Sequence, residues 1–139
     1  MKFSSQIVQS YLVEQRLGRL ATLTQDGLPH IVAVAFVNDE TNLYFSTFTR
    51  TKKVKNIRKN KNVAFIVDDS GGSAGWRYVT VEGHGYLITD SEEFNRVRDL
   101  LCEKYPVYLS DEWAIKGESH TLIRIEPRKV LTANLELII

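Results

Sequence analysis

Cysteine and long apolar runs are both scarce in this chain of 139 residues. The single cysteine, Cys102, excludes an internal disulfide bond, which is usual for proteins of a reducing compartment. No apolar run approaches the roughly 20 residues that a helix needs to cross a bilayer. The first residues also lack the pattern of a signal peptide. The sequence therefore predicts a soluble, cytoplasmic protein with no membrane contact.

The common signatures of catalytic sites are also missing. The three histidines, His30, His84 and His120, have no spacing typical of a metal site, and each is expected to be a structural residue. Cys102 lies among apolar neighbours, which favours a packed thiol over a nucleophile. There is no G-x-S-x-G elbow, P-loop or G-x-G-x-x-G motif. If the protein is an enzyme, its reactive group therefore belongs to a cofactor.

The overall composition is that of an ordinary globular protein. Hydrophobic residues make up 43% of the chain and charged residues 25%, and the formal net charge is +1. A chain of this length buries roughly two thirds of the surface that its unfolded form exposes. Residues 1–139 are therefore predicted to form a single domain. The low net charge argues against a nucleic-acid-binding protein, even though one segment is strongly basic.

Strand patterns dominate the chain. Alternating or continuously apolar segments predict strands at 19–24, 30–37, 43–47, 63–67 and 76–89, and a final β pair at 120–125 and 128–135. The strand at 30–37 is apolar nearly throughout and is expected to be covered on both faces. Gly83 and Gly85 indicate a bulge of the kind that curls a sheet. Six or so strands with two or three peripheral helices predict a mainly β (α+β) protein built on a small barrel.

Three helices are expected around this barrel. An amphipathic helix is predicted at residues 3–15, with Gly18 just past its end. A second helix follows a possible capping box made by Asp90 and Glu93. The third is short and basic, and lies inside YFSTFTRTKKVKNIRKNKN, residues 44–62.

The basic helix is expected to begin after Thr51, a plausible N-cap, with Val54 and Ile57 forming a narrow buried stripe. Residues 50–61 contain seven Lys or Arg and no acid. A helix N-terminus favours acidic residues by about 0.3–1 kcal/mol per charge. Lysines stand there instead.

A phosphate site explains this arrangement. Arg50, Lys52 and Lys53 would converge with free amide groups and with the hydroxyls of Ser46, Thr47, Thr49 and Thr51. The alternative is a solvated basic face, which is the commoner role of a charge run. The residue types alone leave both interpretations open.

The order of three segments resembles the pyridoxamine-phosphate-oxidase-like split-barrel flavoproteins. The segments are RLATLTQDGLPHIVAVAF, LYFSTFTRTKKVKNIRKNKNVAFIV and WRYVTVEGHGYLITD, which lie within residues 17–90. The C-terminal segment IRIEPRKVL is also in the style of the family. The resemblance implies a six-stranded split β-barrel of the FMN-binding type. Thr51-Lys52-Lys53 stands where the oxidases have Ser-Arg-Lys, whose two cations hold the flavin phosphate with help from the preceding strand end, here Ser46-Thr47.

The resemblance also implies which residues bind the cofactor. The strand through residues 30–34 would pass beside the isoalloxazine ring, largely through its backbone. The expected cofactor-binding residues are His30, Ile31, Val32, Ala33, Val34, Ser46, Thr47, Arg50, Thr51, Lys52, Lys53, Tyr78 and Trp113. The family forms two-fold dimers, so a homodimer with cofactor sites at its interface is expected. Three large side chains near loops, Trp76, Tyr108 and Trp113, also suggest an apolar interface.

Two departures from the family pattern limit the predicted function. Val32 stands where the oxidases carry a phosphate-binding arginine, and Tyr78 where they carry a flavin-contacting glutamine. Oxidation of pyridoxamine phosphate itself is therefore not expected. The prediction is an FMN-binding oxidoreductase that transfers a hydride to or from a small molecule. One alternative is an F420-dependent reductase of the same fold, and another is a flavin-binding or carrier protein with little catalysis of its own.

Overall fold

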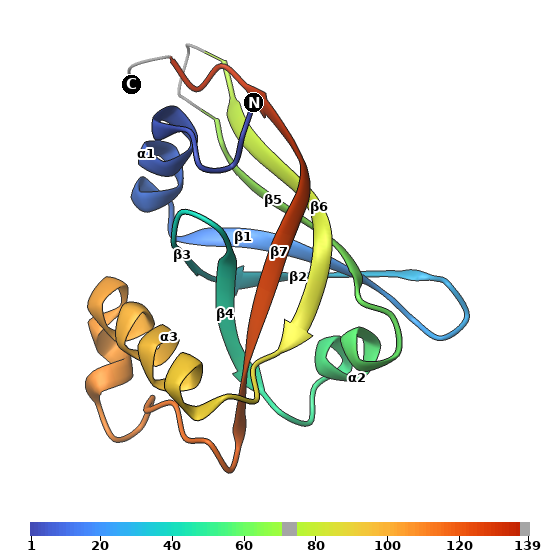
Figure 1. The fold of residues 1–139 in the computed structure, drawn as a ribbon, viewed down its shortest axis with the longest axis vertical. Helices are drawn as coiled ribbons and strands as arrows, with labels where there is room; N and C mark the ends of the chain where they lie inside the picture. The colour runs from blue at the N-terminus through green and yellow to red at the C-terminus, as the bar shows by residue number, and fades with distance from the viewer. Residues whose placement is uncertain (71–74, 137–139) are drawn as a thin grey trace.

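Seven antiparallel strands form one sheet in the computed structural model, which describes residues 1–70 and 75–136. The strands are β1 (Leu17–Leu23), β2 (Pro29–Ala35), β3 (Val37–Asn38), β4 (Leu43–Phe48), β5 (Asn62–Asp69), β6 (Arg77–Leu87) and β7 (His120–Ala133). Their order across the sheet is β2-β1-β5-β6-β7-β4-β3. The sheet is strongly curled, so that β1 and β2 cross behind β6 and β7 (Figure 1).

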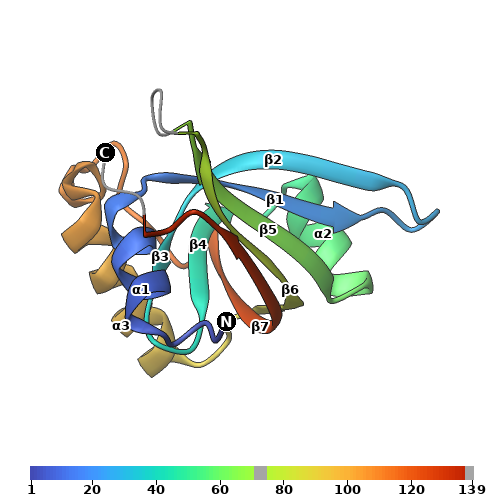
Figure 2. The same cartoon turned by 90° about the horizontal axis from the view of Figure 1, so that it is seen from above.

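The two ends of this sheet are neighbours in the sequence. Only Phe36 separates β2 from β3, the first and last strands of the order. A flat sheet would place these strands six spacings apart, or roughly 29 Å. The two peptide units from Ala35 to Val37 span at most about 7 Å. The sheet must therefore curl back on itself, as seen from above in Figure 2, which confirms the predicted split barrel with one more strand than expected.

Three α-helices and a short 3₁₀ helix surround the sheet in the described part of the chain. They are α1 (Gln6–Glu14), α2 (Lys52–Lys59), α3 (Ser91–Lys104) and the 3₁₀ helix η2 (Pro106–Leu109). In Figure 1, α1 and α3 lie on one side of β4 and β7, and α2 lies on the other. None of these helices is long and apolar enough to span a membrane.

The start of α3 confirms the cap predicted at Asp90. The Asp90 carboxylate accepts a hydrogen bond from the Glu93 amide at 2.9 Å. The Glu93 side chain does not return this contact, because it pairs with Arg124 of β7 at 2.6 Å. The predicted capping box is therefore only half formed, and Glu93 instead ties α3 to the sheet.

Two glycines allow close approaches within the sheet, and only one of these roles was predicted from the sequence. Gly18 does not end α1 but lies in β1, where a Cβ atom would collide with the Phe65 ring. Gly83 lies at the predicted bulge, where the register between β6 and β7 shifts. A Cβ atom there would collide with the backbone of Glu126.

The predicted β pair at 120–125 and 128–135 is wrong. Residues 120–133 form the single long strand β7, and Pro127 lies within it. Pro127 is tolerated because it faces Gly83 at the bulge, where the ladder of hydrogen bonds is already interrupted. A proline in a strand is usually confined to an edge or a bulge, and here the next residue, Arg128, is the extra residue of the bulge.

Two apolar cores position the site. The larger fills the inside of the curled sheet and includes Leu20, Phe36, Phe45, Phe65 and Ile123. The smaller lies between the sheet and α3 and includes Tyr44, Val97, Leu101, Tyr105 and Leu122. Tyr108, expected to be exposed, packs against this second core.

The strand at 30–37 is not covered on both faces as predicted. Val34 of β2 is buried, whereas Ile31 is 65% exposed and Ala33 is also exposed. Among the residues that the structure describes, none covers the outward face of β2.

Candidate functional site

The corner between β4 and α2 forms the predicted helix start. Thr51 occupies the N-cap with extended backbone, but its side chain does not cap α2. Its hydroxyl donates to the Phe48 carbonyl at 3.0 Å and lies 3.3 Å from the hydroxyl of the buried Thr47. The first turn of α2 also contains no acidic residue. Within the described residues, the first amide groups of α2 therefore have no side-chain acceptor, and the positive end of the helix is uncompensated.

The packing of α2 fixes the direction of this helix end. Val54 and Ile57 are buried, which confirms the predicted stripe. Asn56 is buried beside them and donates from its side-chain amide to the Thr22 hydroxyl of β1 at 3.0 Å. The sequence analysis missed this contact. The available signal was an asparagine next to the apolar stripe, because such a residue is unfavourable in a helix interior unless its side chain has a partner.

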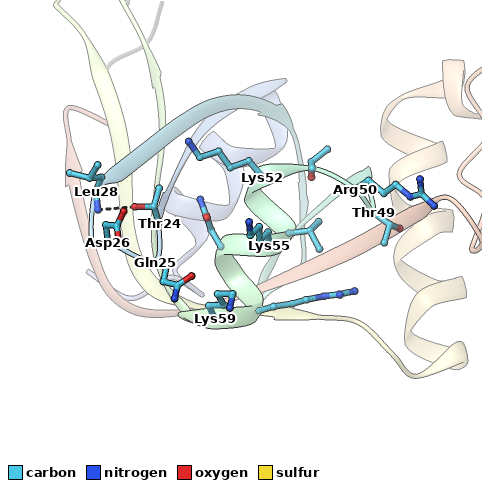
Figure 3. Close-up of a pocket in the computed structure, with 13 residues that line it drawn as sticks. Thr24, Gln25, Asp26, Leu28, Thr49, Arg50, Lys52, Lys55 and Lys59 are labelled. Atoms are coloured by element: carbon cyan, nitrogen blue, oxygen red, sulfur yellow. Dashed lines mark hydrogen bonds between the residues drawn. The ribbon is translucent and has the colours of Figure 1, made fainter.

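A cavity of about 910 Å³ opens between α2 and the hairpin that joins β1 to β2 (Figure 3). Its described lining carries five cationic side chains and one acidic side chain, Asp26 of the hairpin. The cations are Arg50, Lys52, Lys55, Arg58 and Lys59. The local charge is therefore far more positive than the net charge of +1 of the whole chain. Such a wall attracts anions.

The three predicted phosphate cations do not point to one spot. Lys52 extends toward the hairpin side of the cavity, whereas Arg50 extends in the opposite direction, toward α3 (Figure 3). Lys53 is half-buried and is not among the lining residues; burial lowers the pKa of its amine. The structure thus brings Arg50, Thr51 and Lys52 to one cavity and leaves Lys53 beside it.

Strand β2 supplies an orphaned polar atom near this corner. His30 pairs with Thr22 across the β1–β2 ladder, and Thr22 in turn holds Asn56 of α2. The Nδ1 atom of His30 is buried and has no hydrogen-bond partner among the described residues. Buried polar atoms without partners are rare in folded proteins, and a polar ligand atom at this place would satisfy the nitrogen.

The edge position of β2 offers backbone groups as well. β2 lies at one end of the strand order and forms ladder pairs with β1 alone in the described chain. One row of its amide and carbonyl groups is therefore outside the ladder. Of the predicted strand residues, His30, Val32 and Val34 face the interior side, and Ile31 and Ala33 face outward.

Three other predicted site residues lie elsewhere. Ser46 is half-buried in β4 and pairs with Leu122 of β7. Tyr78 lies at the start of β6, whereas Ile57 of α2 packs near Gly85, seven residues further along that strand. Seven residues of strand span roughly 23 Å. Trp113 follows η2 and is 56% exposed. A single chain therefore does not bring Tyr78 to the cationic cavity.

Residues 5–134 match the family model described as pyridoxamine 5'-phosphate oxidase. The chain belongs to the pyridoxamine 5'-phosphate oxidase family. This confirms the resemblance seen in the sequence. The match extends well beyond residues 17–90, because it includes α1, α3 and β7.

Of three proteins similar to this chain, two are named as reductases and one as a FAD-binding protein. A 5a,11a-dehydrotetracycline/5a,11a-dehydrooxytetracycline reductase from Streptomyces rimosus subsp. rimosus is 42% identical over 133 residues, covering 91% of this chain and 80% of the reductase. An F420 reductase of known structure is 28% identical with a TM-score of 0.69, over 88% of this chain and 94% of the other. A FAD-binding protein from Mesorhizobium loti is 26% identical with a TM-score of 0.72, over 91% of each chain.

Proposed function

We propose that this chain is an oxidoreductase that binds a phosphate-bearing flavin or deazaflavin at the β4–α2 corner and transfers a hydride to or from a small molecule. The observation that carries the proposal is the cationic cavity at an uncapped helix start. Its relatives support the redox class, since one is named a reductase at 42% identity and another an F420 reductase.

The residues present fit the phosphate of such a cofactor. The first amide groups of α2 would donate to phosphate oxygens, and Lys52 would add charge from the hairpin side of the cavity. His30 Nδ1 and the free edge of β2 would hold polar groups of the ring. The bound cofactor would supply the hydride chemistry. The protein's part is then to bind, orient and exclude water, in agreement with the lack of a catalytic motif.

The length of the cationic wall favours F420 over FMN. Lys52, Lys55 and Lys59 lie three and four residues apart on one face of α2 and span about 10 Å along the helix. A single phosphate at the helix start would leave the last of these lysines without an anion. F420 carries glutamate residues beyond its phosphate, which would give Lys55 and Lys59 carboxylate partners. FMN, the cofactor expected from the sequence, is the second candidate and would use the corner alone.

We also propose a two-fold homodimer with the cofactor sites at its interface. The uncovered apolar side chains include Ile31 of β2 and Leu131 of β7, and Trp76 and Trp113 are also exposed. Such surface commonly marks an interface. Tyr78 and Trp113, which lie away from their own cavity, would then be available to the partner's cofactor. Light scattering at micromolar concentration should give twice the 15.9 kDa of the chain, and a stable monomer would contradict the dimer.

Titration of the apoprotein with FMN and with F420 tests the cofactor. Lys52→Ala should weaken both by about tenfold or more, because a charge-assisted contact contributes about 1.5–3 kcal/mol. Lys59→Ala should weaken the binding of F420 several-fold and leave the affinity for FMN unchanged. Lys61→Ala is the matched control, because this exposed cation lies just past α2 and does not line the cavity. Binding of neither cofactor by the wild-type protein would refute the proposal.

Turnover separates the enzyme from a flavin store or carrier, which would bind the same cofactor through the same residues. A reductase oxidises the bound reduced cofactor faster when its substrate is added. A carrier shows no acceptor-dependent step in a panel of conjugated ketones and quinones.

A further inference from the structure

Phe36 occupies the point at which the two ends of the sheet meet. It lies between β2 and β3 and belongs to neither ladder, so its backbone groups have left the sheet. Both groups are nevertheless bonded. The Tyr105 hydroxyl accepts a hydrogen bond from the Phe36 amide at 3.1 Å and donates to the Phe36 carbonyl at 2.6 Å. Phe36 is completely buried and Tyr105 nearly so. One side-chain oxygen thus replaces the missing strand partner.

The same oxygen reaches a third segment. It lies 2.8 Å from the carbonyl of Arg16, the residue before β1. A tyrosine has one hydroxyl hydrogen, so the Arg16 and Phe36 carbonyls share it. Burial raises the pKa of Tyr105, which keeps this hydrogen in place at ordinary pH. Tyr105 is the C-cap residue of α3, so it joins α3 to the start of β1 and to the end of β2.

The preceding residue holds Phe36 from another side. The Lys104 amine lies 4.1 Å from the centre of the Phe36 ring and donates to the Leu12 carbonyl of α1 at 3.3 Å. Two consecutive residues at the end of α3 therefore fix one residue of the sheet, one through its backbone and one through its ring.

We propose that Tyr105 is a positioning residue for the cofactor strand β2. β2 is an edge strand, paired with β1 alone in the described chain, and Phe36 immediately follows its last residue. With Tyr105 in place, His30 and the free edge of β2 keep one position relative to the β4–α2 corner. A displacement of about 1 Å in a binding strand is enough to lose much of the affinity of a preorganised site. This inference rests on the proposed function, because that proposal identifies the ligand as FMN or F420.

Tyr105→Phe tests this role because it removes a single oxygen. We expect the dissociation constants of both FMN and F420, whichever the wild-type protein binds, to rise about tenfold. They should be measured well below the melting temperature, where both proteins are fully folded. Hydrogen exchange of the Phe36 amide should become faster.

Tyr108→Phe is the matched control. Tyr108 is half-buried, its ring lies 6.0 Å from that of Tyr105, and its hydroxyl has no hydrogen bond among the described residues. Its replacement should leave the dissociation constant unchanged.

The wild-type protein provides a second measurement that needs no variant. Coupling between two sites is reciprocal. Binding of FMN or F420 at the corner should therefore slow hydrogen exchange at the Phe36 amide, although Phe36 is buried and lines no part of the cationic cavity.

The outcomes separate the two proposals. If wild type binds a cofactor but Tyr105→Phe binds it equally well, Tyr105 is merely structural and the inference is wrong, even if the melting temperature falls. Unchanged exchange at Phe36 on cofactor binding would overturn it too. If wild type binds neither FMN nor F420, the proposed function fails and the inference fails with it.

Discussion

Two of the helices that flank the sheet, α2 and α3, begin in opposite ways. α3 starts with Asp90, which caps the Glu93 amide, and its first turn contains Glu92 and Glu93. α2 starts with Thr51, whose hydroxyl is bonded elsewhere, and its first turn contains lysines and no acid. The start of α3 lowers the free energy of the folded chain by compensating the helix dipole. The start of α2 forgoes that stabilisation and leaves its amides and cations available to an anion. The start of α3 is therefore built for stability, whereas the start of α2 is suited to binding an anion.

Charge reversal at α2 should produce the largest effect. Lys52→Glu should weaken cofactor binding by about 100-fold, because a charge-assisted contact is lost and a repulsion takes its place. The same change should raise the free energy of unfolding by about 0.3–1 kcal/mol, because it places an acid at a helix N-terminus. Cofactor titration should therefore show weaker binding, and urea unfolding should show a more stable protein.

Glu92→Lys at the start of α3 is the control for this reversal. It should lower the free energy of unfolding by a similar 0.3–1 kcal/mol and leave cofactor affinity unchanged. Equal losses of affinity in the two variants would show that the helix starts do not differ in function.

Lys104 at the end of α3 contrasts with the exposed lysines of α2. Burial, with the nearby Arg16 guanidinium, lowers the pKa of Lys104 from 10.5 to about 8. The unfolded chain therefore binds this proton more tightly, so the charge of Lys104 destabilises the folded state below pH 8. Lys104→Met removes this penalty, but it also removes the hydrogen bond to Leu12 and the contact with the Phe36 ring. With these losses and solvent screening, the free energy of unfolding at pH 7 should rise by only about 1–2 kcal/mol.

The difference in unfolding free energy between wild type and Lys104→Met should depend on pH. The wild-type protein should approach the stability of Lys104→Met as the pH rises from about 8 toward 10.5, where the penalty disappears. Urea unfolding of both proteins at pH 7 and pH 9.5 measures the difference. A gap that stays constant over this range would mean that Lys104 is not the titrating group.

Removal of the α3 cap should have a smaller effect than removal of the Lys104 charge and should change stability alone. Asp90→Ala should lower the free energy of unfolding by about 1 kcal/mol, because the Glu93 amide loses its acceptor. Cofactor affinity should not change. Asp90→Asn retains a capping oxygen and should recover most of the loss in thermal unfolding. A drop in affinity with Asp90→Ala would indicate that α3 takes part in the site.

Local patterns in the sequence predicted both helix starts well. Thr51, Val54 and Ile57 lie within seven residues, so their spacing alone indicates the helix and its buried stripe. The bulge at Gly83 was also recognisable, because a glycine inside a strand has few other uses. Arg50, Thr51 and Lys52 come from one continuous segment, so that part of the candidate site could be read directly.

Contacts between segments that are distant in the chain could not be predicted from the sequence. The continuity of β7 through Pro127 depends on Gly83, more than forty residues earlier. The hairpin side of the cavity, with Thr24 and Asp26, becomes part of the site only when Asn56 anchors α2 to β1. The lysines further along α2 were not among the predicted site residues, because nothing in the sequence shows which surface lies opposite them.

The one-residue connection at Phe36 has a consequence for protein engineering. A Cβ atom on Gly27, in the hairpin after β1, would meet no other atom within 4 Å, so the fold can accommodate extra residues there, although they would alter one wall of the cavity. An insertion beside Phe36 would separate strands that are held together by a single link and would take Tyr105 out of register with its partners. A circular permutant opened at this point would lose the link that forces the sheet to curl. The tolerance of this chain to insertion should therefore change from high to negligible within about ten residues of sequence.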